Sequence, residues 1–329
     1  MALTLDFINA HIAKWELALA KPFYPYRAKW PGRLFHHAPI QNAVKILLDG
    51  NLRSRDDPAN AKELDVAAPD VIATRGAAHS FARLYFRPRT PTQWHIEGIR
   101  KQGECKWEGA HAPILVMMVF SAQTVLSLQN IKFCDRNMQI GSADPGDSED
   151  YFSKIPFDKV FHEGGTGGDH SIIEHRCAEV LATSPLPLAD HLQWIYCRTD
   201  AEKQTLLHLM GDKGKHWAQK ILISNDLLVF ERKYVFVEEV SLASDGVVFK
   251  LSPRYDSQNV SVTVKAWDRS QKQIVNFSNS SLSARPAPPS AALRWKTPGA
   301  FPNGTYLVEI ELEGHLAFKD KLSIGGFLV

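Results

Sequence analysis

The stretch Y-F-R-P-R-T-P-T-Q-W-H, from Tyr85 to His95, begins like a β-strand and then sets two arginines around a proline. Proline fixes its own φ angle and disfavours the helical conformation in the residue before it. Pro88 and Pro91 therefore predict a rigid, extended arm after the strand, with Arg87 and Arg89 projecting from it. Because a planar guanidinium binds phosphate through two parallel hydrogen bonds, the arm indicates a phosphate-bearing ligand.

Length and composition are those of an ordinary globular protein. The chain has 329 residues, of which 44% are hydrophobic and 22% are charged, so it is long enough for two domains. The formal net charge of +2 excludes a general polycation, and any surface for nucleic acid must therefore be a local basic patch.

Cysteine usage and hydropathy indicate a cytoplasmic protein. The four cysteines include no C-x-x-C pair and fit neither a zinc knuckle nor a disulfide framework, which favours a reducing compartment. No signal peptide is visible, and the longest apolar run, Pro113 to Phe120, is far too short to span a bilayer. We therefore expect a soluble protein of the cytoplasm that does not enter a membrane.

Two regions of the chain differ in their pattern of apolar and polar residues. Residues 1–230 mix helical and strand patterns, which predicts an α/β domain. Residues 235–329 consist of short alternating runs such as V-S-V-T-V-K-A-W and T-Y-L-V-E-I-E-L, separated by turn signals such as S-D-G and P-N-G. Several short strands in so few residues predict an all-β, immunoglobulin-like sandwich.

Individual elements can be placed from spacing and caps. Apolar periodicity predicts a helix from Leu5 to Leu19 and another from Ile40 to Leu48, the second ended by Gly50. Pro113 to Phe120 predicts a buried strand. The capping box T-D-A-E, which begins at Thr199, predicts a helix that ends near Gly211.

The segment from Asp135 to Glu174 is rich in Gly, Asp and Ser. A loop of this length without regular structure is usually functional or disordered. Its glycine run, Gly164 to Gly168, lacks the Lys-Ser/Thr of a P-loop, so a flexible loop is the plainer interpretation. The histidines do not have the spacing of a metalloprotease site, so we expect no metal; they include His36, His37, His162, His170 and His175.

A single carboxylate, Glu179, stands in the apolar segment H-R-C-A-E-V-L-A directly after this loop. As a strand, the segment places Cys177, Glu179 and Leu181 on one face, where apolar groups point. Burying an unpaired carboxylate costs free energy, so two interpretations stay open: a salt-bridged or edge-exposed glutamate, and a functional acid. Cys177 is expected to be buried and inert.

Four segments, in this order, resemble the DarT-type ADP-ribosyltransferase toxins, which use NAD to modify nucleic-acid bases. L-F-H-H-A-P-I-Q-N-A-V-K-I-L-L-D-G-N-L, from Leu34, is similar to the family's opening strand, its NAD-binding histidine and the following helix. Y-F-R-P-R-T-P-T-Q is similar to the F-Y-F-x-P-R-S-P arm, P-I-L-V-M-M-V-F with F-C-D-R-N to the next strand, and R-C-A-E-V-L to the strand that carries the catalytic glutamate. The resemblance covers residues 30–210 and implies a mixed α/β (α+β) fold with a central NAD cleft.

The resemblance assigns roles to individual positions. Glu179 matches the catalytic glutamate, and Arg89 matches the arginine that is essential in the family. His36 matches the first residue of the H-x-T motif that holds NAD, but Ala38 stands in place of its threonine. The implied cofactor-binding residues are His36, Ala38, Asn42, Tyr85, Phe86 and Arg87. The implied substrate-binding residues are Trp94, His95, Arg136, Asn137, His170 and Arg176, with residues 135–174 as the substrate-reading loop.

The chemistry of NAD agrees with these assignments. Breaking the bond between nicotinamide and ribose develops positive charge at the anomeric carbon, which a nearby carboxylate stabilises as the charge forms. Glu179 is predicted to supply that carboxylate and to accept the proton of the attacking base nitrogen. Cations near the arm predict a groove for the acceptor strand, with solvated surface charge as the alternative for part of the set: Arg53, Arg55, Arg75, Arg83, Arg100 and Lys101.

The sequence therefore predicts a toxin-type enzyme that transfers ADP-ribose from NAD to a base in single-stranded DNA. The sequence T-P-T-Q-W-H, in place of S-P-M-L, favours the branch of the family that modifies guanine. Two alternatives stay open: the same chemistry on RNA, and a catalytically degenerate nucleic-acid-binding scaffold, which Ala38 favours. The resemblance also implies an antitoxin partner and a role in phage defence, and we expect the sandwich to dock an antitoxin, a chaperone or a phage component.

Overall fold

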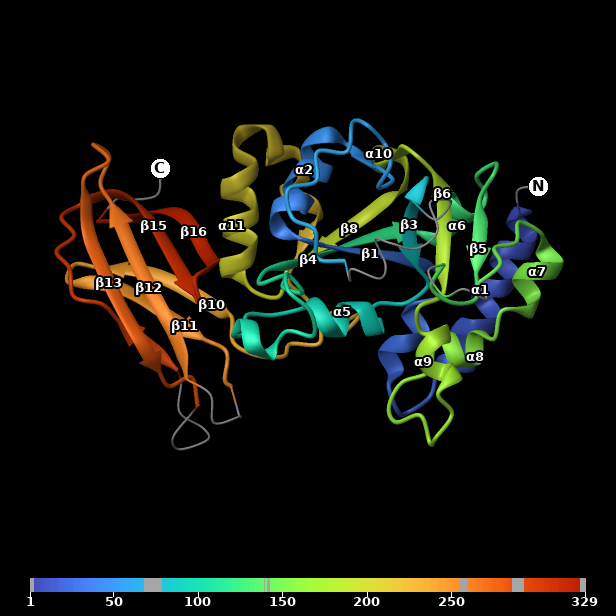
Figure 1. Cartoon of the computed structure of the whole chain (residues 1–329). Coiled ribbons are helices and arrows are strands. Elements are labelled where there is room, and N and C mark those ends of the chain that lie inside the picture. Colours follow the sequence, from blue (N-terminus) through green and yellow to red (C-terminus); the bar gives the residue numbers. More distant parts are fainter. Residues whose placement is uncertain are drawn as a thin grey trace. The chain divides into compact units, whose positions relative to one another are not determined.

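The computed structural model describes residues 3–67, 79–138, 140, 143–254, 259–285 and 293–325 (Figure 1). The chain forms two compact units, each assembled from separate stretches of sequence. The first unit comprises Met1–His95, Val116–Tyr196 and Ser224–Glu231. The second comprises Ile96–Leu115, Cys197–Ile223 and Arg232–Val329. None of the helices within the described ranges combines the length and the hydropathy needed to cross a bilayer.

The first unit mixes helices and strands along its whole length. Its described helices are α1 (Leu5–Leu19), η1 (Pro25–Lys29), α2 (Ile40–Asp49), α5 (Pro91–Ile96), α6 (Ala122–Leu126), α7 (Glu149–Lys154), α8 (Phe157–Val160), α9 (Ser171–His175) and α10 (Leu188–His191). Its described strands are β1 (Arg33–Pro39), β2 (Asn51–Leu52), β3 (Phe81–Tyr85), β4 (Leu115–Ser121), β5 (Lys132–Cys134), β6 (Glu179–Thr183), β7 (Leu186–Pro187) and β8 (Leu192–Tyr196).

The elements predicted from spacing in this unit are confirmed. α1 begins after Thr4, whose side chain accepts a hydrogen bond from the backbone N–H of Phe7 (3.3 Å). α2 ends at Gly50, whose φ of 73° is left-handed and suits glycine. In β4 every residue from Leu115 to Phe120 is buried, and because both faces of the strand are covered, its sequence is continuously apolar.

One sheet brings the strands of this unit together in the order β5-β6-β3-β1-β4-β8. The pairings β1–β3, β3–β6 and β5–β6 are antiparallel. Their register places Phe35 opposite Tyr85, Tyr85 opposite Glu179, and Glu179 opposite Cys134. Because residues opposite each other project to the same face of a sheet, Glu179 lies in a row between Tyr85 and Cys134.

Residues 135–174 differ from the predicted structureless loop, because they contain α7, α8 and α9. The buried rings of Phe152, Phe157 and Phe161 anchor these short helices, with centroids 5.1 Å apart for the first pair and 5.6 Å for the second. In the sequence, the many Gly, Asp and Ser residues of the segment obscured these three phenylalanines. Burial of the rings gives the segment a local core, which fixes it in one structure.

The arm after β3 also differs from the prediction. Pro91 is the first residue of α5, a position where proline is favoured because its missing N–H is not needed. Arg89 has a left-handed φ of 56°, so the arm turns instead of running extended. Arg87 is 1% exposed instead of projecting outward. Pro88 restrains its own φ and the residue before it, but it leaves Arg89 free to turn.

The second unit contains the predicted β-sandwich. In the described ranges, one antiparallel sheet has the order β10-β11-β14 and the other β13-β12-β15-β16. Both contribute to one core, in which Phe249 and Phe318 are buried. This is the layout of immunoglobulin-like sandwiches. The strands are β10 (Val237–Ala243), β11 (Gly246–Leu251), β12 (Val260–Trp267), β13 (Gln273–Leu282), β14 (Arg294–Lys296), β15 (Gly304–Leu312) and β16 (His315–Ile324).

Two earlier stretches pack with this sandwich. They contain η2 (Gln102–Glu104), α11 (Asp200–Met210), η3 (Gly211–Lys220) and β9 (Ile221–Leu222). Thr199 caps α11 as predicted, accepting from the N–H of Glu202 (3.2 Å), and its hydroxyl donates to the carbonyl of Val237 (2.8 Å). Thr205 accepts from the N–H of Lys319 on β16 (3.0 Å). The division into functional domains at 1–230 and 235–329 stays a prediction, since this unit reaches further back in the sequence.

Candidate active site

Glu179 is the first residue of β6, and its side chain is 0% exposed. Its Oε1 accepts hydrogen bonds from Nε (3.2 Å) and Nη2 of Arg83, and its Oε2 accepts from the backbone N–H of Met138 (2.9 Å). A buried carboxylate is tolerated when it is paired and hydrogen-bonded in this way. The glutamate is therefore salt-bridged, which is compatible with a role as a functional acid.

Arg83 reaches Glu179 from β3, the neighbouring strand. Its Nη2 also donates to Oδ1 of Asn137 (3.2 Å), and its backbone carbonyl contacts Nδ1 of His36 (2.9 Å). Burial disfavours the charged guanidinium, but the adjacent carboxylate outweighs this effect and raises the pKa of Arg83 above its usual value. The Arg83 side chain is 20% exposed, so it is the member of the pair that meets solvent.

The titratable groups beside this ion pair are held uncharged. Burial, reinforced by the Glu179 carboxylate, raises the pKa of Tyr85 above its usual value and that of Cys177 to about 12. Burial likewise raises the pKa of Cys134 to about 11. Cys177 lies in the turn before β6 and not within the predicted strand, and it is buried as predicted. The charge at this site therefore belongs to Glu179 and Arg83.

The two histidines of β1 lie close to the same site. His37 stacks on Tyr85, with ring centroids 5.5 Å apart and planes 6° from parallel. Burial and the neighbouring His36 lower the pKa of His37 to about 3. Burial also lowers the pKa of His36, whose ring contacts the Arg83 carbonyl. Both rings are therefore neutral at pH 7, and Ala38 beside them is buried.

A second cluster of charges forms around Glu163. Arg87 donates to Oε1 of Glu163, to the carbonyl of His162 and, at 3.3 Å, to the carbonyl of Val160. Its guanidinium lies 5.0 Å from the centre of the Trp30 ring. Burial lowers the pKa of Arg87 to about 10, so it stays charged at neutral pH. Its donors thus hold protein groups together.

Arg89 belongs to the same cluster. Its Nη1 donates to Oε2 of Glu163 (3.1 Å) and to the Tyr26 hydroxyl (3.4 Å), and its Nε and Nη2 donate to Oε2 of Glu231 (both 3.3 Å). Burial opposes the charge, but Glu231 and Glu163 outweigh it and raise the pKa of Arg89. Among the described residues, Arg89 makes neither a hydrogen bond nor an ion pair with Glu179. The two residues expected to share the reaction centre are therefore held by different partners.

Arg176 connects this cluster to strand β6. Its Nε donates to the carbonyl of His162 (3.1 Å), and its Nη2 donates to the carbonyl of Gly164 (2.7 Å). Nη2 also lies 2.8 Å from Nδ1 of His162. Burial lowers the pKa of Arg176. Since Arg176 precedes Glu179 by three positions, the loop that begins at Gly164 is tied to the start of β6.

The balance of charge in the second cluster favours an anion. Arg87 and Arg89 pair with the carboxylates of Glu163 and Glu231, and Arg176 donates to the carbonyl of His162 beside them. These five side chains carry three positive and two negative charges. Arg89 is 21% exposed, so its guanidinium is open to solvent. A partly exposed guanidinium in a positive cluster suits a phosphate oxygen.

Three other residues that were predicted to bind the cofactor contact protein groups or are buried in the structure. The side chain of Asn42 accepts from the N–H groups of Glu63 (2.9 Å) and Leu64 (3.0 Å) and donates to the Leu64 carbonyl (2.6 Å). Phe86 packs edge-on against Phe152 and Phe157 (Figure 1 shows the α7–α8 region). Ala38 is buried.

The predicted substrate-binding residues lie in different surroundings. Arg136 pairs with Asp135 and Glu174, both at 2.9 Å. His170 is exposed next to α9, and Trp94 on α5 is 46% exposed. His95 is half-buried at the end of α5. Asn137, whose contact with Arg83 is given above, is the member of this set that the structure joins to Glu179.

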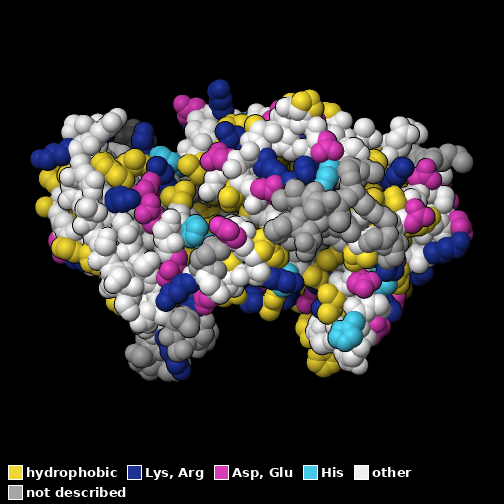
Figure 2. Space-filling view, in the orientation of Figure 1, with side chains coloured by type: hydrophobic (Ala, Val, Ile, Leu, Met, Phe, Trp, Pro, Cys, Tyr) yellow, Lys and Arg dark blue, Asp and Glu magenta, His cyan; other side chains and the backbone are white. Residues whose placement is uncertain are grey.

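The predicted basic groove is corrected for several of its members. Arg83 is the partner of Glu179, and Arg100 is 3% exposed in the second unit. Arg53 pairs with Asp49 and Asp57, and Arg55 pairs with Asp65. Arg75 lies outside the described residues, and Lys101 is exposed in the second unit. On the face shown in Figure 2, basic and acidic side chains are interspersed.

Arg83 was predicted only as a member of the basic groove and not as the partner of Glu179, and Glu163 was not singled out from the sequence. Arg83 stands in F-A-R-L-Y, where alternation with buried Ala82 and Leu84 resembles an ordinary half-exposed strand. A buried carboxylate on one strand requires a cation from a neighbour, and that requirement was the available signal. For Glu163, nothing in the sequence indicates that it would join Arg87 to Arg89.

Within the described ranges, no group of His, Cys, Asp or Glu side chains is arranged to hold a metal ion. A family model described as "ssDNA thymidine ADP-ribosyltransferase, DarT" matches residues 35–229. Three solved structures are similar to the chain. Thermus sp. 2.9 DarT in complex with ADP-ribosylated ssDNA is 19% identical, with a TM-score of 0.49, over 60% of this chain and 96% of that one.

The same Thermus DarT in complex with NAD+ is 18% identical over 59% of this chain and 96% of that one, with a TM-score of 0.46. Thermosipho africanus DarTG in complex with ADP-ribose is 16% identical over 64% of this chain and 53% of that one, with a TM-score of 0.43. No curated protein matches the chain.

Proposed function

Since the chain belongs to the DarT family of single-stranded DNA ADP-ribosyltransferases, which use NAD, we propose that Glu179 is its catalytic carboxylate and that Arg83 holds that carboxylate in place. The observation that carries this proposal is the environment of Glu179. It is the fully buried carboxylate at the start of β6, fixed by Arg83 on one oxygen and by the Met138 N–H on the other.

The reaction that follows is a substitution at the ribose. The bond between C1′ of the ribose and the pyridinium nitrogen breaks, and its electron pair leaves with neutral nicotinamide. Glu179 stabilises the positive charge that develops on the sugar, because a fixed carboxylate in a dry site interacts more strongly with that charge than water does. A nitrogen of the acceptor base forms the new bond to C1′, and its proton passes to the carboxylate of Glu179.

Arg83 supports this role through geometry and charge. A guanidinium that donates two N–H groups to one oxygen restrains the position of the carboxylate and places a positive charge beside it. A carboxylate has about four lone-pair sites, so Oε2 still has capacity for a sugar hydroxyl beside its bond from Met138. The protonated Tyr85 and Cys177 add no competing charge.

Arg89 would contact the donor's pyrophosphate in this proposal. Its side chain is 21% exposed, and the cluster has three guanidinium groups, of Arg87, Arg89 and Arg176, against the two carboxylates of Glu163 and Glu231. Arg87 is 1% exposed, so it would act by placing Glu163 and the neighbouring backbone. Arg89 and Glu179 would then act on different parts of the dinucleotide, which explains why different partners hold them.

We propose thymine and guanine as the acceptor bases to be distinguished. The description of the matching family model names thymidine, which favours thymine. The sequence T-P-T-Q-W-H after Arg89, in place of S-P-M-L, favours guanine as the acceptor base. A non-catalytic scaffold is the second candidate, because Ala38 lacks the hydroxyl of the H-x-T motif. The paired and buried Glu179 argues against that candidate, since a degenerate site has no need to bear the cost of a buried ion pair.

We also propose that the sandwich docks a regulatory protein such as an antitoxin. Deleting residues 235–329 is unsuitable as a test, because the second unit also contains 96–115 and 197–223. Substituting exposed residues of β13 by lysine in the full chain keeps the core intact. Loss of inhibition by the partner, with unchanged modification of DNA, is the result that supports docking.

The proposed function is tested by mixing the protein with NAD and single-stranded oligonucleotides, each containing one kind of base, in DNA and RNA form. Mass spectrometry should find one added ADP-ribose per modified base, and chromatography an equal amount of released nicotinamide. Modification of one DNA base identifies the acceptor. Unchanged oligonucleotides together with intact NAD would favour the scaffold instead.

A further inference from the structure

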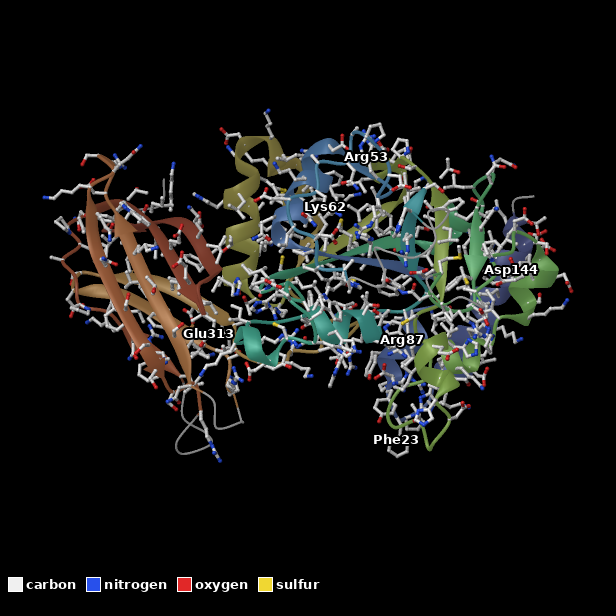
Figure 3. All side chains as sticks on the ribbon, viewed as in Figure 1. Phe23, Arg53, Lys62, Arg87, Asp144 and Glu313 are labelled. Atoms are coloured by element: carbon white, nitrogen blue, oxygen red, sulfur yellow. The ribbon has the colours of Figure 1, made fainter. Side chains whose placement is uncertain are left out.

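The segment K-P-F-Y-P-Y-R, from Lys21 to Arg27, exposes aromatic rings that the core does not use. Phe23 is 81% exposed and Tyr24 is 42% exposed. Three of the seven residues are aromatic, two are cations and none is an acid. Phe23 lies at the outer end of the lobe that carries α8 and α9 (Figure 3), and hydrophobic side chains gather at the end of this lobe (Figure 2).

The segment is held in a fixed conformation although its rings are exposed. Pro25 is the first residue of η1, and Tyr24 before it has a left-handed φ of 58°. Arg27 donates to the carbonyl of Phe161 (3.0 Å), and its guanidinium lies 5.4 Å from the centre of the Tyr24 ring. These contacts hold the Tyr24 ring, which therefore loses little conformational freedom when a base stacks on it.

The same segment is continuous with the arginine cluster. The Tyr26 hydroxyl lies 3.4 Å from both Oε2 of Glu163 and Nη1 of Arg89. The Tyr24 hydroxyl lies over Gly164, where a Cβ atom would come within 3.2 Å of it. Gly164 in turn accepts from Arg176 (2.7 Å), which precedes Glu179 by three positions. Contacts therefore lead from the exposed rings to the start of the catalytic strand.

We propose that Phe23 and Tyr24 form a stacking platform for the acceptor strand, on which bases next to the modified one lie; this rests on the proposed function. Exposed aromatic rings, in a segment whose own charged residues are both cations, match the flat faces of bases and the phosphates between them. Every base has such a face, so the platform would bind single-stranded DNA without selecting a sequence. The segment lies before residue 35, where the family match begins.

The platform is tested with Phe23→Ala in the full chain, since an 81% exposed side chain contributes little to folding. We expect the KM for an oligonucleotide of about 12 nucleotides to rise by about tenfold, with kcat unchanged. The KM for a mononucleotide should not change, because a single nucleotide cannot occupy the reaction centre and the platform at the same time. Phe23→Trp should restore the native KM, whereas Phe23→Leu should not, since stacking requires an aromatic face.

Leu17→Ala is the matched control, because Leu17 is 79% exposed on α1 outside the segment and should leave both KM values unchanged. Fluorescence anisotropy of the longer oligonucleotide, without NAD, measures its binding to the protein separately from catalysis. Weaker binding by Phe23→Ala supports the platform even if the native protein modifies no DNA, in which case the proposed function alone fails. Equal binding and equal KM in Phe23→Ala and native protein overturn the platform.

Discussion

Replacing Arg83 by glutamine should disable the site while leaving the fold in place. In the native protein two N–H groups of Arg83 meet one oxygen of a carboxylate that is 0% exposed. Removing one partner of a buried ion pair costs about 3–5 kcal/mol. Because Arg83 is 20% exposed and the Met138 N–H remains, we expect the lower end, about 3 kcal/mol, or a melting temperature about 6–12 °C lower.

The effect on activity follows from the proton that the orphaned carboxylate then binds. A buried carboxyl group without its cation favours the neutral form, which neither stabilises the sugar's positive charge nor accepts a proton. We expect kcat to fall by about 10²–10³-fold at pH 7. The sign of the pH dependence is fixed: the ratio of variant to native activity should rise as the pH is raised, because ionised Glu179 is restored.

The assay measures ADP-ribose transfer to a DNA oligonucleotide between about pH 6 and pH 9, with calorimetry on the same samples. Arg83→Lys should recover part of the activity, since it restores the charge but not the two-pronged contact. Arg55→Gln removes a partly exposed arginine paired with Asp65, and should change stability by less than about 1 kcal/mol. An Arg83→Gln enzyme with near-native activity and a native pH profile would refute the reasoning.

Three further outcomes are expected. Because burial and Glu179 raise the pKa of Cys177 to about 12, iodoacetamide at pH 8 should label Cys177 far more slowly than the partly exposed Cys105, and equal rates would count against the buried site. Gly164→Ala should cost about 1–2 kcal/mol in urea denaturation and weaken the Tyr24 contact, since φ is +83° there; unchanged stability would contradict it. The pKa of His37 is lowered from 6.5 to about 3 by burial and by its neighbour, so below pH 6.5 the unfolded chain binds a proton that the native one does not. The free energy of unfolding should therefore fall between pH 7 and pH 5, by up to about 2 kcal/mol for this group, and a His37→Gln variant should show a correspondingly smaller fall.

Much of the fold could be predicted from local patterns. The continuous apolar run of β4 predicts a buried strand, and the glycine after α2 predicts the end of a helix. The structure contains both features where the local patterns place them. The alternating runs after residue 235 likewise predict strands with one buried face, and the two sheets follow. The extent of the second unit was not predictable, because the cap on α11 reaches Val237 through a contact far apart in sequence.

The site was predictable at Glu179 but not at its partner. An acid inside an apolar segment is conspicuous, whereas Arg83 alternates with buried neighbours as any strand cation does. Its role depends on the register that places β3 beside β6, which no local pattern contains. For the same reason Arg87 seemed to point outward from a stiff arm, although Glu163, distant in sequence, draws it inside. Charge pairs between distant segments are thus the part that required coordinates.

The central claim is that the carboxylate of Glu179 drives the transfer. Glu179→Gln keeps the shape of the side chain and removes its charge, so NAD binding, followed by calorimetry, should stay within a few-fold of native. Single-turnover transfer of ADP-ribose to single-stranded DNA should fall by about 10³-fold or more. Transfer by Glu179→Gln at a rate close to native would contradict the account and assign the chemistry to another group.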